Sequence, residues 1–397
     1  MRRVVKVSRI RIIITIIVVV LTTLLTGCTG KEPNEIAYVV ALGIDSTDDD
    51  NYKITIQYAN TTQISGGASE SGGKAGSEIV DNVTIEAPNI YAGVGLANNI
   101  VSKSFSMSHA KLIVFSKEIA EKGVKDMIET LVRSEEIRPD VFIAVANTTA
   151  NDYLTSVNPE MEVNPAQYYQ LIYQKNQLVG IPDGQLREFF TGLYTDNYDS
   201  ILPVAGVIEG AGGNSQNDDK GQSKDGQNEG SEGSSESLDS FESKSSDDKD
   251  ENEKEKDAEK NTSKYEYDIK NYVGGETAIE KKNKAEAIGA AVFEKDKMVG
   301  ELGEVETEIC KILKGDYTYS YLTYYNNDTP DIPITVKTTQ QKKPKYKIDT
   351  DKKTVDIELY IESDLYSLPA DYNVENKIED FERDVANYTS SACTEFI

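Results

Sequence analysis

The 397-residue chain has no tryptophan, one histidine and three cysteines. Metal sites built from imidazole or thiolate need several His or Cys residues at set spacings, and this chain has no such motif. Three cysteines also make no disulfide framework. Basic residues are scarce relative to acids, with 42 Lys and Arg against 68 Asp and Glu, a formal net charge of −26. This balance argues against binding to nucleic acid and against electrostatic adhesion to anionic lipid.

Motifs for phosphate binding and catalysis are also missing. The chain contains neither GxGxxG nor GxxxxGK[ST]. Ser106 and Ser108 lie close to His109 in sequence, but closeness in sequence does not make a catalytic triad, and we expect His109 to be a partly buried structural residue at the start of a strand. Nothing selects a carboxylate pair for glycoside cleavage among the 68 acids. We therefore predict no catalytic residues, no cofactor and no enzymatic activity.

A cluster of aspartates at residues 45–51, DSTDDDN, superficially resembles a calcium loop. It lacks the twelve-residue spacing, the glycine and the final glutamate of an EF-hand. We interpret the cluster as an exposed turn and predict no metal site. Its four acids are Asp45, Asp48, Asp49 and Asp50.

The N-terminus has the pattern of a secretory signal. An apolar run at residues 12–25 leads to Leu25-Thr26-Gly27-Cys28, and the run is shorter than the about 20 residues of a membrane span. The ending resembles a bacterial lipobox, in which the cysteine is lipidated and becomes the mature N-terminus. We predict a signal peptide at 1–27 and lipidation of Cys28; the alternative is an uncleaved anchor helix. The preceding basic residues are Arg2, Arg3, Lys6, Arg9 and Arg11.

Residues 28–208 alternate between strand and helix patterns, which predicts an α/β domain. A hairpin is expected at 36–58 and a loop at 60–78. A nearly all-apolar run at 141–146 is typical of a strand buried on both faces. The other expected strands are 111–115 and 201–207, and the expected helices are 88–101, 118–132, 151–157, 164–179 and 186–196.

Residues 209–264 have a different composition. Between 209 and 260 there are 17 Asp and Glu against 7 Lys and Arg, and Leu238 and Phe241 are the large apolar residues of that stretch. Such a segment cannot bury enough apolar area to offset its chain entropy, so we predict a disordered acidic linker. A specific acidic binding segment is the alternative.

Residues 265–397 predict a second, α+β domain. Two short strands are expected at 286–302, a helix at 304–315 that stops at Gly315, and further strands at 331–340, 344–349 and 354–363. A final amphipathic helix runs from Val374 to Ala392. Cys310 and Cys393 are expected to be buried free thiols, although a disulfide between them stays open. The predicted fold class is therefore α+β, multidomain, with small mixed sheets and flanking helices.

Several segments together resemble the Ger(x)C family, the C subunits of spore germinant receptors in endospore-forming Firmicutes. "SHAKLIVFSKEIAEKG" (108–123) carries most of the resemblance, and "GAAVFEKDKMVGEL" (289–302) is its second anchor. Cys28, followed by "NEIAYVVALGID" and "YKITIQYAN", completes the pattern. The resemblance covers residues 28–208 and about 286–397.

The resemblance implies a lipoprotein on the outer face of the spore inner membrane. It implies a multi-spanning A subunit and a transporter-like B subunit as partners, and a nutrient response that triggers ion and dipicolinate release. It carries over no catalytic residues. A solute-binding lipoprotein of a transporter is the alternative function, although that class usually has two doubly wound lobes.

Two features depart from the family pattern. The acidic segment is longer than expected, and family members usually continue past the helix that ends near Ala392. We therefore expect the C-terminal domain to be truncated at its end, with an open sheet edge and an exposed helix face.

Overall fold

The computed structural model describes residues 13–18, 35–49, 51–59, 80–159, 162, 164–174, 180–208, 271–277, 283–326, 329–367 and 378–397. Three predictions fall on residues outside these ranges: lipidation of Cys28, the loop at 60–78 and the acidic linker at 209–264. Residues 13–18, within the expected signal peptide, are helical. The described residues all belong to one compact unit formed by residues 1–211 and 269–397.

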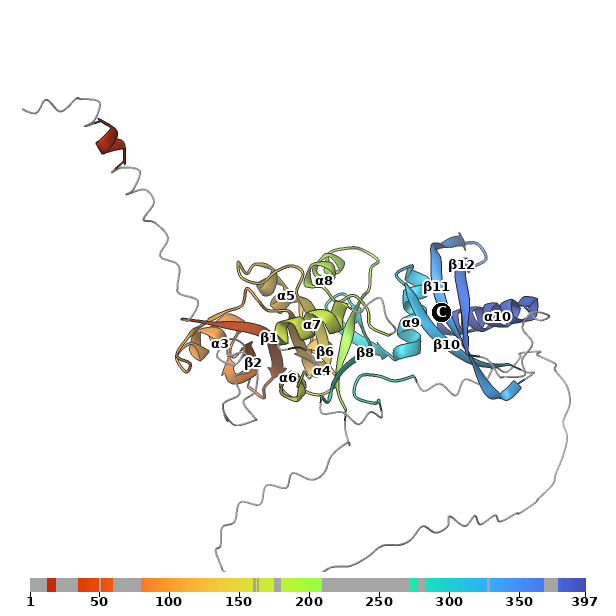
Figure 1. The fold of residues 1–397 in the computed structure, drawn as a ribbon, viewed down its shortest axis with the longest axis horizontal. Helices are drawn as coiled ribbons and strands as arrows, with labels where there is room; N and C mark the ends of the chain where they lie inside the picture. The colour runs from red at the N-terminus through yellow and green to blue at the C-terminus, as the bar shows by residue number, and fades with distance from the viewer. Residues whose placement is uncertain are drawn as a thin grey trace, which may run out of the picture. The chain divides into compact units, whose positions relative to one another are not determined.

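A nine-stranded mixed sheet forms the larger part of the fold (Figure 1). Its strand order is β3-β2-β1-β5-β6-β7-β8-β9, and β4 pairs with the start of β1. The pairs β1–β5, β5–β6 and β6–β7 are parallel, and an antiparallel pair of strands extends the sheet on each side. The strands are β1 (Ile36–Ser46), β2 (Tyr52–Ala59), β3 (Val80–Ala87), β4 (Ser104–Ser106), β5 (Leu112–Ser116), β6 (Phe142–Ala146), β7 (Ser200–Val207), β8 (Ala285–Glu294) and β9 (Lys297–Leu302).

The central strands β5 and β6 are almost entirely apolar, because both faces of the sheet are covered. Every residue of β5, LIVFS, and of β6, FIAVA, is buried. Alternation along β5 sends Ile113 and Phe115 into the core on one face, while Leu112 and Val114 enter the core on the other. The predicted strands 111–115, 141–146 and 201–207 are confirmed.

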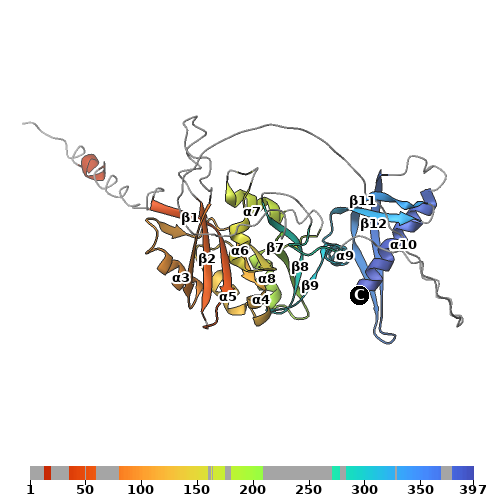
Figure 2. The ribbon, with the colours of Figure 1, turned by 90° about the horizontal axis from the view of Figure 1, so that it is seen from below.

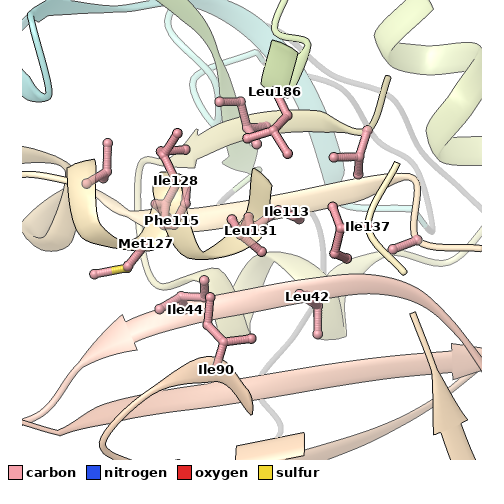
Figure 3. Close-up of a cluster of buried hydrophobic side chains, with 14 of the residues drawn as sticks. Leu42, Ile44, Ile90, Ile113, Phe115, Met127, Ile128, Leu131, Ile137 and Leu186 are labelled. Carbon is pink, nitrogen blue, oxygen red and sulfur yellow. The ribbon is translucent and has the colours of Figure 1, made fainter. Parts of the chain in front are cut away.

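One face of the sheet is covered by α3 (Ile90–Ala97), α4 (Lys117–Lys122), α5 (Lys125–Val132) and α8 (Leu186–Leu193). Figure 3 shows Ile128 and Leu131 of α5 lying over Ile113 and Phe115 of β5. The single helix expected at 118–132 is in fact two. Gly123 separates them with a φ of 122°, a conformation that suits glycine and interrupts the helix.

The opposite face is covered by α6 (Ala150–Ser156) and α7 (Pro165–Gln174). Tyrosines fill much of this core, and their hydroxyls bond to one another or to a buried amide. The hydroxyls of Tyr153 and Tyr173 lie 3.0 Å apart, and Tyr169 donates to Gln57 Oε1 at 2.5 Å. Buried tyrosines need such partners, so this network accounts for part of the high tyrosine content.

Strands β8 and β9 follow the acidic segment in sequence, yet they pair with β7 and complete the large sheet. Figure 2 shows β1 and β2 toward one end of this sheet and β8 and β9 at the other. The sheet therefore crosses the boundary that the sequence analysis placed before residue 265. The expected α+β class, with mixed sheets and flanking helices, is confirmed, but the first sheet is larger than expected because of this added pair.

A second, three-stranded antiparallel sheet has the order β10-β11-β12. Its strands are β10 (Tyr319–Asn326), β11 (Thr329–Asp349) and β12 (Thr354–Ser367), and it packs with α9 (Glu304–Lys314) and α10 (Ile378–Phe396). The strands expected at 331–340 and 344–349 are one strand, β11. Its register shifts between Gln340 and Lys345, where Pro344 has no N–H for the ladder.

Helix α9 links the two sheets, since it packs on β8 and β9 and also on β11 and α10. It ends as predicted at Gly315, which has a φ of 75°. Its first turn is closed by Glu306, whose carboxylate accepts the backbone N–H of Gly303 at 2.8 Å.

Candidate functional site

The clearest candidate site is a charged cavity of about 370 Å³ beside α8, β7 and the C-terminal end of α9. Its lining residues come from two stretches, 182–202 and 311–318, which lie more than one hundred positions apart in sequence. Phe189 and Leu202 contribute an apolar wall. The charged side chains are Asp183, Glu188, Lys311, Lys314 and Asp316.

Burial dominates the electrostatics of this cavity. Lys311 is 5% exposed, and its ammonium donates to the carbonyl of Ile181 at 3.2 Å. Loss of hydration lowers the pKa of Lys311, since burial penalises its charged form, while the nearby acids oppose this effect. Lys314 sits 5.2 Å from the centre of the Tyr198 ring, a cation–π contact.

The carboxylates of the cavity crowd one another. The pKa of Glu188 is raised, first by burial and then by the neighbouring charge of Asp183. One oxygen of Asp183, Oδ1, is buried without a hydrogen-bond partner in the described part of the chain. The cavity thus holds three carboxyl groups and two lysine side chains beside its apolar wall. The site has no signal in the sequence, because no local pattern brings residues 183 and 311 together.

His109 is placed differently from the prediction. It is exposed and lies in a turn. In this turn the N–H of Ala110 donates to the carbonyl of Met107 at 3.0 Å, and β5 begins only at Leu112. Ser108 Oγ lies 3.0 Å from His109 Nδ1, and the ring packs edge-on against Tyr38. The expectation of a partly buried histidine was wrong, because the chain turns at the surface before it enters the sheet.

Asp45 is also misplaced by the sequence interpretation, which put it in an exposed turn. It is 4% exposed at the end of β1. Its carboxylate accepts the backbone N–H groups of Ala150 at 2.6 Å and Asn151 at 3.1 Å, so it satisfies donors at the start of α6. Burial raises its pKa, and these hydrogen bonds oppose the rise. Asp48 and Asp49 are exposed, as predicted.

The remaining sequence candidates are the thiols. Cys310 and Cys393 are both free, with Cys393 buried and Cys310 half-buried. Burial raises the pKa of Cys310, and it raises the pKa of Cys393 to about 11, so neither is an activated nucleophile. Within the described ranges, no group of three or more His, Cys, Asp or Glu side chains could hold a metal ion. Among the described helices, none has both the length and the apolar character that a membrane crossing requires.

Comparison with known proteins connects this fold to one family. The model for the spore germination protein N-terminal domain matches residues 30–207, and the model for the spore germination B3/GerAC-like C-terminal domain matches residues 288–397. The chain belongs to the GerAC-like family of spore germination proteins. The resemblance stated from the sequence is thereby confirmed, and both anchor segments of that resemblance lie within GerAC-like domains.

Individual GerAC-like proteins are distant in sequence. Spore germination protein KC of Bacillus subtilis (strain 168) is 26% identical over 174 residues, which cover 40% of this chain and 42% of that protein. Putative spore germination protein YfkR of the same organism is 28% identical over 145 residues, covering 36% and 37%. The chain thus spans about two fifths of the length of the curated relatives it matches. A crystal structure of the GerBC protein is 14% identical, with a TM-score of 0.39, over 89% of this chain and 80% of that one.

Proposed function

We propose that this chain is the C subunit of a nutrient germinant receptor and that it helps to trigger spore germination. The observation that carries the proposal is the presence of both GerAC-like domains, in order, in one chain. In the proposed division, the N-terminal domain covers residues 28–208, the acidic linker 209–264 and the C-terminal domain 265–397. The names of the relatives as spore germination proteins support this function.

The proposed subunit is held at the membrane by lipid on Cys28, after removal of residues 1–27. The Leu-Thr-Gly-Cys ending after an apolar run supports this site. Buried acyl chains contribute about 0.8 kcal/mol per CH₂, so more than one chain is needed for a stable anchor. The proposed location is the outer face of the spore inner membrane.

The proposed partners are a multi-spanning A subunit and a transporter-like B subunit, and the C subunit itself has no catalytic role. Aromatic side chains exposed on the three-stranded sheet support assembly, since aromatic residues are enriched at interfaces. Tyr321 and Tyr366 are more than half exposed and pack edge-on, with ring centres 5.2 Å apart. A solute-binding lipoprotein is less well supported, because the described ranges form one large mixed sheet and one small antiparallel sheet rather than two doubly wound lobes.

The first test is to delete the gene and follow dipicolinate release from purified spores over a panel of amino acids, sugars and nucleosides. We expect loss of the response to one nutrient class, restored when the intact gene is returned. An unchanged response to every nutrient, in a strain with no second copy of the gene, would contradict the proposal.

The anchor is tested separately in the complemented strain. Cys28→Ala should release the protein from spore membranes and impair the nutrient response, whereas Cys310→Ala serves as the matched control and should leave both unchanged. Incorporation of labelled palmitate into the wild type and the Cys310→Ala variant, but not into Cys28→Ala, identifies the acylated residue. Normal membrane retention of Cys28→Ala would contradict the assignment.

A further inference from the structure

The turn that follows α3 presents two aliphatic side chains to solvent. Leu96 is 46% exposed and Ile100 is 65% exposed, four residues apart. Their backbone is fixed: the N–H of Ile100 donates to the carbonyl of Ala97 at 3.0 Å, and Asn98 Oδ1 accepts the N–H of Phe105 at 2.7 Å. We call residues 96–104 the tip. Its apolar side chains are held outward by an ordered turn.

The tip lies at the end of the domain where the chain arrives from Cys28. Strand β4 runs parallel to the start of β1, with Ser104 paired to Ile36. Ile100 is four positions before Ser104, a reach of at most about 14 Å, and Cys28 is eight positions before Ile36, a reach of at most about 29 Å. A lipid on Cys28 would therefore keep the tip within a short distance of the bilayer.

The chain segment that contains the tip carries no acidic residue. Residues 87–117 contain no Asp or Glu, although the chain as a whole has 68 in 397 residues. Of its lysines, Lys103 belongs to the tip, whereas Lys117 follows β5 at the opposite end of β1 and pairs with Glu301 at 2.9 Å. A carboxylate from another element does reach this run, since Glu136 accepts the N–H of Met107 at 2.7 Å. The tip itself therefore places no carboxylate against an anionic bilayer, which would repel one.

We propose that the tip rests in the lipid–water interface, with Leu96 and Ile100 inserted between headgroups. This inference rests on the lipid anchor of the proposed function. Lipid fits better than a protein partner because the protruding side chains are aliphatic and are flanked by the polar residues Asn99 and Ser102, which suit headgroups. Protein hot spots favour Trp, Tyr and Arg instead. The contact would orient the domain on the membrane as well as tether it.

The absence of tryptophan gives a direct test, because one introduced tryptophan is the sole indole in the protein. Ile100→Trp is compared with Ile348→Trp, which places the probe on β11 at a site 68% exposed. The full lipidated chain is reconstituted into vesicles of phosphatidylcholine and phosphatidylglycerol, with and without brominated acyl chains. We expect a blue-shifted emission and strong quenching by bromolipid at position 100, and neither at position 348.

The outcomes separate this inference from the proposed function. If the vesicles float with bound protein but the emission at position 100 matches that at position 348, the inference is wrong and the lipid anchor stands. If the protein does not float, the anchor is wrong and the inference falls with it. Shielding of position 100 that requires added A and B subunits would assign the tip to a protein contact and overturn the lipid assignment.

A second variant tests the role of charge. Ser102→Glu, added to Ile100→Trp, places a carboxylate in the acid-free run on an exposed side chain. We expect it to reduce the quenching by bromolipid, and more so as the phosphatidylglycerol content rises, whereas Ser102→Gln should not. Equal quenching in both variants would contradict an ordered contact with an anionic surface. Circular dichroism of each variant verifies that the fold is unchanged.

Discussion

The two sheets of this molecule differ in how completely they are covered. Every residue of β5 in the nine-stranded sheet is buried, whereas no residue of β12 in the three-stranded sheet is. Helices pack on both faces of the first sheet, and its two cores include many aliphatic side chains and four tyrosines. A smaller cluster on the second sheet includes Ile312, Tyr317 and Cys393, and in β11 Ile334 and Val336 are also fully buried.

This difference shows where the stability of the described unit resides. Apolar area removed from water contributes about 25 cal/mol per Å², so a strand buried on both faces contributes far more than one that is half exposed. The large sheet acts as a rigid platform next to the proposed anchor. The small sheet keeps exposed surface, including Tyr321 and Tyr366, that remains free for contacts with other molecules.

The largest expected effect is in the centre of the large sheet. Ile113→Ala removes a fully buried side chain from β5, between the α5 and β1 side chains shown in Figure 3. We expect a loss of about 2–5 kcal/mol in the free energy of unfolding, because a cavity remains where the side chain was. Urea denaturation followed by circular dichroism measures it. A loss below 1 kcal/mol would mean that this core is not the main source of stability.

A smaller loss is expected where a polar contact fixes a helix to the large sheet. Asp45→Ala leaves the buried N–H of Ala150 and the partly buried N–H of Asn151 without their acceptor. We expect a cost of about 1–3 kcal/mol, the usual cost of such unsatisfied donors. The matched control is Asp48→Ala, in which the side chain is exposed. Equal urea midpoints for the two variants would show that Asp45 does not hold α6.

Much of the large sheet could be predicted from the sequence, because its strands have local signatures. The sequence alone predicts β5 and β6 from their continuous apolar runs, and it predicts the hairpin of β1 and β2. Strand β3, VDNVTIEA, was missed because it contains several polar residues. It is the outermost strand of the sheet, and most of its side chains are only partly buried or exposed. Strand β10, YSYLTYYN, was also missed, although its tyrosines and threonine favour a strand.

Long-range placements could not be predicted, since they depend on which elements the fold brings together. Asp45 reads as part of an aspartate turn, and its partners on α6 lie more than one hundred residues away. The charged cavity joins Asp183 to Lys311 across the acidic segment. The addition of β8 and β9 to the large sheet likewise has no local signal. The resemblance to the family, in contrast, could be recognised from the sequence, because it rests on contiguous segments.

The small-sheet region should show a pH dependence that comes from Glu308 on α9. Its carboxylate accepts the hydroxyl of Tyr317 at 3.1 Å, and burial raises its pKa above the usual 4.5. The folded state therefore binds this proton more tightly than the unfolded state does. The resulting stabilisation is fully present below pH 4.5 and is lost as the pH rises through the raised pKa.

Glu308→Gln removes this titration but keeps an acceptor for Tyr317. We expect its thermal midpoint to fall less than that of the wild type between pH 4.5 and pH 7. Glu379→Gln on α10 changes the net charge equally at an exposed site, and it should leave the slope of the wild type nearly unchanged. Parallel slopes for the wild type and Glu308→Gln would contradict the role of Glu308.

The smallest expected effect repeats the Ile-to-Ala change on the weaker sheet. Ile357 on β12 is half-buried, so Ile357→Ala removes less apolar contact than Ile113→Ala and leaves no enclosed cavity. We expect a cost of about 1 kcal/mol or less, near the range of surface substitutions. Urea denaturation of the two variants under the same conditions compares the sheets directly. Equal costs would mean that β12 is covered as fully as β5, and the contrast between a rigid platform and an open sheet would then fail.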